Sequence, residues 1–134
     1  MEYRAEASSL EGFIQQLAVG YLARGYRYFF QGRIPDDKDP RAVDAKLIKR
    51  YGLDISKFER ARRKRSGLAN VQYLRYGHHF VLISTPGEHD PLRADHVLKD
   101  AHDVPIKLGG YAVSFRDGHA QVRIERATWK QLQA

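Results

Sequence analysis

Six basic side chains crowd one short stretch of this chain, between residues 57 and 65, which holds a single acid, Glu59. They are Lys57, Arg60, Arg62, Arg63, Lys64 and Arg65. Like charges three or four positions apart on a helix repel one another, and a bound phosphate would relieve that repulsion. Arginine also forms paired hydrogen bonds with phosphate oxygens and with the major-groove edge of guanine. The chemistry that this stretch indicates is binding of a polyanion.

A second group of reactive side chains lies further along, because all six histidines fall in the second half of the chain. Glu88, His89 and Asp90 are consecutive and offer ligands for Mg²⁺ or Mn²⁺. The segment His119-Ala120-Gln121 is similar to the histidine–hydrophobic–histidine metal motif of single-strand nicking enzymes, with Gln in place of the second His. One alternative therefore stays open, a metal-dependent nuclease or nicking enzyme that uses His, Asp and Glu of residues 78–125. Its catalytic candidates are His89 and His119, and its candidate metal ligands are Glu88, His89, Asp90 and His119.

The charge of the chain is uneven. Its 134 residues carry 23 Lys and Arg against 16 Asp and Glu, a net charge of +7. Residues 1–67 hold 15 basic and 9 acidic side chains, whereas residues 68–134 hold 8 and 7. A local excess of this kind favours a polyanionic partner more than a diffuse excess does. The composition thus agrees with phosphate binding by the basic stretch.

Other classes of function find no support in the composition or the motifs. The absence of cysteine excludes a disulfide framework, a thiolate zinc site and a cysteine nucleophile. No apolar run approaches about 18 residues, and the acidic N-terminus does not fit a signal peptide, so we expect a cytoplasmic protein without a membrane span. Phosphate-loop, dinucleotide and nucleophile-elbow motifs are missing as well. We therefore expect no catalytic residues and no cofactor, unless the nuclease alternative with Mg²⁺ or Mn²⁺ holds.

The N-terminal part of the chain is predicted to supply one helix and one strand. Ser8 and Glu11 have the spacing of a capping box and open an amphipathic helix. Gly25 ends that helix. The aromatic run over residues 26–30 then predicts a strand.

Two further helices flank a short turn, and the second of them carries the basic stretch. Asp39 followed by proline begins the first of this pair, and Gly52 ends it. Either Asp54 or Ser56 caps the basic helix over residues 55–65. A three-residue turn that contains glycine is typical of a helix-turn-helix. The apolar side of the basic helix is expected to pack on the preceding helix through Ile55, Phe58 and Ala61.

A predicted hairpin with strands over 71–76 and 79–85 follows the helix pair. With it, the order helix, strand, helix, helix, hairpin over residues 8–85 resembles a winged helix. The resemblance implies that the basic helix enters the major groove and that the hairpin touches the DNA backbone. Arg75 and His78, at or near the hairpin tip, would add contacts to nucleic acid.

The rest of the chain predicts more strand than helix. Asp117-Gly118 is a strong signal for a second antiparallel hairpin. A weak helix is predicted over 92–102 and a short C-terminal helix over 128–133.

The sequence as a whole predicts a single α+β domain over residues 1–134, with 86–134 as a candidate C-terminal extension. The expected function is nucleic-acid binding through the basic helix and the following hairpin. Double-stranded DNA is favoured over RNA because the major groove of A-form RNA is closed to side chains. A single recognition helix reads only a short site, so a homodimer is a further expectation. A protein-interaction module that binds an acidic partner is the second open alternative.

Overall fold

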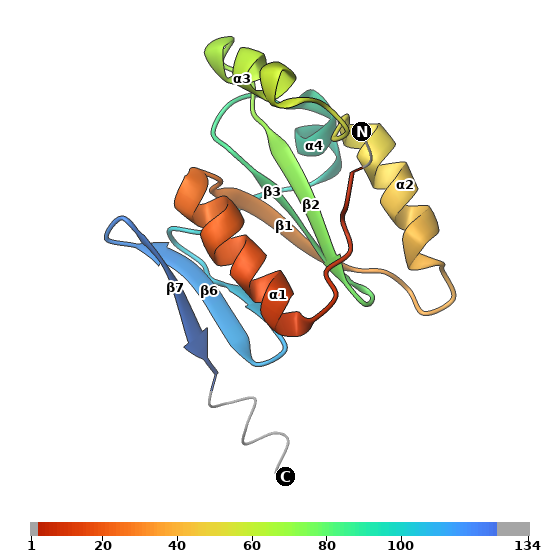
Figure 1. Cartoon of the computed structure of the whole chain (residues 1–134), viewed down its shortest axis with the longest axis vertical. Helices are drawn as coiled ribbons and strands as arrows, with labels where there is room; N and C mark the ends of the chain where they lie inside the picture. Colours follow the sequence, from red (N-terminus) through yellow and green to blue (C-terminus); the bar gives the residue numbers. More distant parts are fainter. Residues whose placement is uncertain (1–2, 126–134) are drawn as a thin grey trace.

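Two antiparallel sheets form the frame of the fold. The computed structural model describes residues 3–125 and has the predicted α+β character. One sheet has the strand order β2-β3-β1-β4 and the other the order β5-β6-β7 (Figure 1). The strands are β1 (Tyr28–Arg33), β2 (Val71–Tyr76), β3 (His79–Ser84), β4 (Lys99–Asp100), β5 (Ile106–Leu108), β6 (Tyr111–Arg116) and β7 (His119–Ile124).

Both predicted hairpins are confirmed. Gly77, with φ of 59°, makes the left-handed turn between β2 and β3. Asp117 and Gly118 have φ of 53° and 78° between β6 and β7, and two successive left-handed residues are what a type I′ hairpin turn requires. The turn chemistry therefore sets the register of each strand pair.

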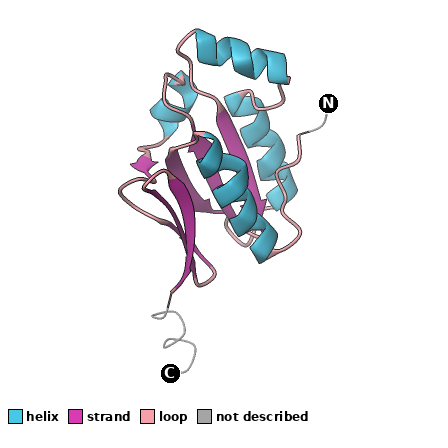
Figure 2. Cartoon of the chain, turned by 60° about the vertical axis from the view of Figure 1, so that its left-hand side comes forward, coloured by secondary structure: helices cyan, strands magenta, loops and turns pink. Residues whose placement is uncertain are grey.

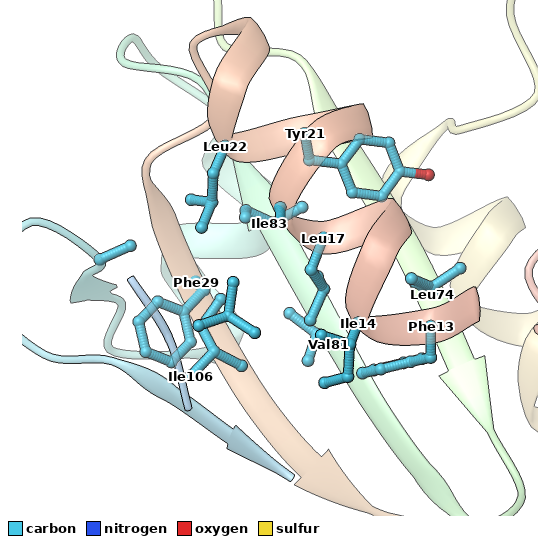
Figure 3. Packing of buried hydrophobic residues seen from close by; sticks show 13 residues of the cluster. Phe13, Ile14, Leu17, Tyr21, Leu22, Phe29, Leu74, Val81, Ile83 and Ile106 are labelled. Carbon is cyan, nitrogen blue, oxygen red and sulfur yellow. The ribbon is translucent and has the colours of Figure 1, made fainter. Parts of the chain in front are cut away.

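One helical segment packs against both sheets. It begins as α1 (Leu10–Gln15), continues as the π-helix η1 (Gln16–Tyr21) and ends as the 3₁₀ turn η2 (Leu22–Arg24). The Ser9 hydroxyl caps it by accepting a hydrogen bond from the Gly12 N–H at 3.0 Å, so the predicted cap at Ser8 is wrong by one residue. Its buried side chains meet both sheets in one core, which includes Phe13, Ile14, Leu17, Leu22, Phe29, Val81, Ile83, Ile106 and Val113 (Figure 3).

Two other helices cover the opposite face of the four-stranded sheet. They are α2 (Pro40–Tyr51), which begins and ends as predicted, and α4 (Asp90–Asp95). Because side chains alternate along a strand, Tyr73 and Leu82 face these helices, whereas Leu74 and Val81 face α1. The second core cluster consists of Ala5, Tyr51, Leu53, Val71, Tyr73, Leu82 and Leu92.

Helix α3 (Lys57–Arg65) lies at one end of the fold, beyond the ends of the strands (Figures 1 and 2). Ser56, one of its two predicted caps, accepts a hydrogen bond from the Glu59 N–H at 3.2 Å. No residue of α3 is buried, and Phe58 is 83% exposed. The predicted packing of its apolar side on α2 is therefore wrong. The winged-helix arrangement is not confirmed, because α3 contributes nothing to a shared helical core.

The segment after β3 contains less helix than the sequence predicts. Helix α4 ends at Asp95 because His96 adopts an extended backbone, with φ of −140° and ψ of 146°. The chain then forms β4, which pairs with β1, and residues 99–125 are mostly strand. The helix predicted over 128–133 lies outside the described residues.

Candidate nucleic-acid interface

Two arginines of α3 point inward and hold the helix on the body of the protein. Arg60 donates to the carbonyl oxygens of Leu53 at 2.8 Å and Val71 at 3.2 Å. Arg63 donates twice to the Ala69 carbonyl, at 2.7 and 3.2 Å. Hydrogen bonds from a charged donor are stronger than neutral ones. The structure thus uses two of the predicted nucleic-acid contacts as anchors for the helix.

The other four predicted cations of α3 are exposed: Lys57, Arg62, Lys64 and Arg65. Helical geometry places residues four and seven positions apart on one face, so Phe58, Arg62 and Arg65 share the outward face of α3. Arg62 lies 3.3 Å from a carboxylate oxygen of Glu59, one turn earlier. Both side chains of that pair are solvated, so the pair contributes little stability and leaves Arg62 accessible.

The net charge of the chain is concentrated in α2, α3 and the turn between them. Residues 40–65 contain ten Lys and Arg and three Asp and Glu, a surplus of 10 − 3 = 7. The chain as a whole carries +7, so the remaining residues are balanced. The side chains of Lys46, Lys49 and Arg50 on α2 are also exposed. Residues 40–65 therefore carry the positive charge that would attract a polyanion to this protein.

An ion pair between Arg50 and Asp95 neutralises part of this positive charge. Arg50 donates twice to Asp95 of α4, at 2.9 and 3.0 Å, and the Tyr51 hydroxyl donates to the same carboxylate at 2.7 Å. The hydrogen bonds from Arg50 and Tyr51 lower the pKa of Asp95 to about 2. Asp95 therefore ties α4 to the end of α2 and stays ionised at all ordinary pH values.

Of the two hairpin residues predicted to touch nucleic acid, His78 lies at the tip as predicted, whereas Arg75 is not on the surface. Arg75 is only 2% exposed and donates to both carboxylate oxygens of Asp44, at 2.7 and 2.8 Å, and to the Gly77 carbonyl at 2.7 Å. Its guanidinium is therefore structural, and the predicted surface contact is wrong. The half-buried His78 ring lies 3.0 Å from the Ile34 carbonyl oxygen through Nδ1. Figure 1 shows the hairpin tip at the far end of β2 from α3.

The histidines of the nuclease alternative do not come together. His89 accepts a hydrogen bond from the Leu92 N–H at Nδ1, which leaves the ring proton on Nε2, 3.0 Å from the Tyr51 carbonyl. Burial lowers the pKa of His89, which favours this neutral form. His119 is exposed in the other sheet, on β7. Within residues 3–125, no group of three or more His, Asp or Glu side chains is arranged to hold a metal ion.

The arrangement contains features that the sequence interpretation missed. The whole charge surplus lies within residues 40–65, whereas the prediction placed the basic excess in residues 1–67 and assigned no nucleic-acid contact to residues 40–54. The exposure of Phe58 and the anchoring roles of Arg60 and Arg63 had no signal in the sequence, because both depend on which backbone carbonyls lie beneath the helix.

Comparisons with known proteins found no match to this chain among protein-family models, curated proteins or solved structures. Across the described part of the chain, no helix is long and apolar enough to span a membrane.

Proposed function

We propose that this protein binds DNA through the outward face of α3 and the adjoining end of α2. One observation carries the proposal. Helix α3 is fixed by Arg60 and Arg63 and leaves Lys57, Arg62, Lys64 and Arg65 in solvent, within the region that holds all of the net charge. A helix held in place before binding loses little conformational entropy when it meets its ligand.

Double-stranded DNA is the first ligand to consider. An exposed helix fits the major groove of B-form DNA, whereas the major groove of A-form RNA is too narrow for side chains to read. Arg62 and Arg65 are one turn apart on the outward face and suit phosphate or guanine edges. The hairpin tip lies at the other end of the sheet, so the helix makes the contact without a wing (Figure 1).

The test is a binding series with duplex DNA, single-stranded DNA and duplex RNA between 50 and 200 mM salt. The double variant Arg62→Gln/Arg65→Gln removes two outward cations of α3. The matched control, Arg116→Gln/Arg123→Gln, removes two exposed cations of the three-stranded sheet. Each lost phosphate contact lowers the slope of log K against log salt by about 1. We expect a loss of about 2 in slope for the α3 variant and no change for the control.

Three outcomes would contradict the proposal. Equal losses for both variants would mean that binding is diffuse and does not use α3. No binding to any of the three ligands at 50 mM salt would remove the function, and a salt-resistant complex with an acidic protein would then favour the interaction-module alternative. Strand cleavage that appears only when Mn²⁺ is added to the same samples, seen on denaturing gels, would instead favour the nuclease alternative.

A further inference from the structure

The most exposed large aromatic side chain of the described residues lies on α3, the helix that carries the exposed cations. Phe58 is 83% exposed, and it follows Lys57 and shares its helix face with Arg62 and Arg65. A phenylalanine in solvent is an unused apolar surface. Three cations around it favour an anionic partner over an apolar peptide.

The outward position of Phe58 is held by the anchors of α3. At 100° per residue, Phe58 lies about 140–160° around the helix axis from Arg60 and Arg63. Those arginines bind the carbonyls of Leu53, Val71 and Ala69, so α3 cannot turn Phe58 inward without breaking four hydrogen bonds. The ring is therefore presented to solvent by a fixed helix.

A groove runs beside α3, next to Lys57. It has a volume of about 550 Å³ and lies between α3 and the π-helical segment η1. No aspartate or glutamate lines it. Its lining includes the exposed cations Arg24 and Lys57, the carbonyl-bound side chain of Arg60, and the polar side chains Gln16, Tyr26 and Gln72. The groove offers donors and positive charge to a nucleic-acid strand that leaves the outward face of α3.

We propose that this surface prefers DNA with an unpaired base, and that Phe58 stacks on that base. The inference rests on the proposed function and specifies which kind of DNA the protein prefers. In a continuous duplex each base face is covered by its neighbours, whereas an unpaired base has a free aromatic face. Arg62 and Arg65 bind the flanking phosphates while the strand that carries the unpaired base continues along the groove beside Lys57.

The experiment compares three DNA ligands of equal length: a continuous duplex, a duplex with a one-nucleotide bulge, and the same duplex with an abasic bulge. The two bulged ligands carry the same charge and differ only in the base. Stacking on an aromatic side chain corresponds to about 5- to 150-fold in affinity per base. We expect the wild-type protein to bind the bulged base more tightly than the abasic bulge by a factor in that range. Phe58→Ala abolishes this difference, and Phe58→Trp keeps it.

Control variants separate stacking from charge and from general surface effects. Arg62→Gln lowers the affinity for all three ligands by the same factor. Val97→Ala, which truncates an apolar side chain that is 91% exposed and lies outside α3, changes none of the three affinities. Equal wild-type affinity for the bulged base and the abasic bulge overturns the inference while the proposed function stands. An equal loss on all three ligands in Phe58→Ala overturns it as well. No wild-type binding to any ligand overturns the proposed function, and this inference with it.

Discussion

The buried Arg75–Asp44 pair allows a quantitative test of how this fold is held together. Asp44 accepts three hydrogen bonds, two from Arg75 at 2.7 and 2.8 Å and one from the Tyr73 hydroxyl at 2.6 Å. Asp44→Ala would leave the Arg75 guanidinium, 2% exposed, with the Gly77 carbonyl and the half-exposed carboxylate of Glu6. Removing one partner of a buried charge pair costs about 3–5 kcal/mol.

That cost is a large share of a total stability of about 5–15 kcal/mol. With a urea m-value of about 2 kcal/mol per molar, the unfolding midpoint of Asp44→Ala should fall by roughly 2 M. The triple variant Asp44→Leu/Tyr73→Phe/Arg75→Met removes all the polar groups together. It should recover most of the loss, because an apolar set of similar volume leaves no unpaired buried charge.

The assay is urea unfolding followed by circular dichroism, combined in a mutant cycle over the three positions. A loss below about 1 kcal/mol for Asp44→Ala would refute the reasoning, since that is the value of a solvated pair. A triple variant as unstable as Asp44→Ala would refute it too. The folded triple variant should bind DNA with wild-type affinity, because Arg75 contributes no surface charge.

Three further predictions concern single sites. Arg50 and Tyr51 lower the folded-state pKa of Asp95 to about 2. The Asp95 carboxylate therefore contributes fully to stability above pH 4, and this contribution is lost as the pH falls towards 2. The urea midpoints of Asp95→Asn and wild type should converge at pH 2. Burial lowers the pKa of His89. The contribution of the neutral ring to the free energy of unfolding is therefore complete above about pH 6.5 and falls as the pH drops below that value. His89→Asn, which keeps a helix cap, should flatten the dependence of stability on pH between pH 7 and 5. Gly87 has φ of 131° and a Cβ there would meet backbone atoms at 2.8 Å, so Gly87→Ala should lower the free energy of unfolding by about 1–3 kcal/mol in the same assay.

Elements whose signals are local could be predicted from the sequence. Asp39 and Gly52 bound α2 as expected, and Asp117-Gly118 makes the predicted hairpin. In each case the deciding interaction lies within a few residues, as a side-chain cap or a left-handed backbone conformation. The helix predicted over 92–102 failed at His96, where pairing of β4 with β1, about 70 residues away in sequence, competes with helix continuation.

The orientation of α3 could not be predicted from its pattern. The spacing of Ile55, Phe58 and Ala61 indicates an apolar side that packs inward, yet Arg60 and Arg63 face the body instead. Carbonyl oxygens of the turn before α3 and of the segment after it accept hydrogen bonds from these two arginines. Which carbonyls lie beneath a helix depends on the folded path of the chain.

The sequence by itself determined the α+β class, both hairpins, the caps of α2 and the position of the charge surplus over residues 40–65. Only the tertiary structure decided which cations remain accessible. It commits Arg60, Arg63 and Arg75 to buried or half-buried acceptors and leaves Lys57, Arg62, Lys64 and Arg65 in solvent on the same helix as Phe58. The physical reason is that an arginine is bound or free according to the acceptors that folding brings within hydrogen-bond distance, and those come from other parts of the chain.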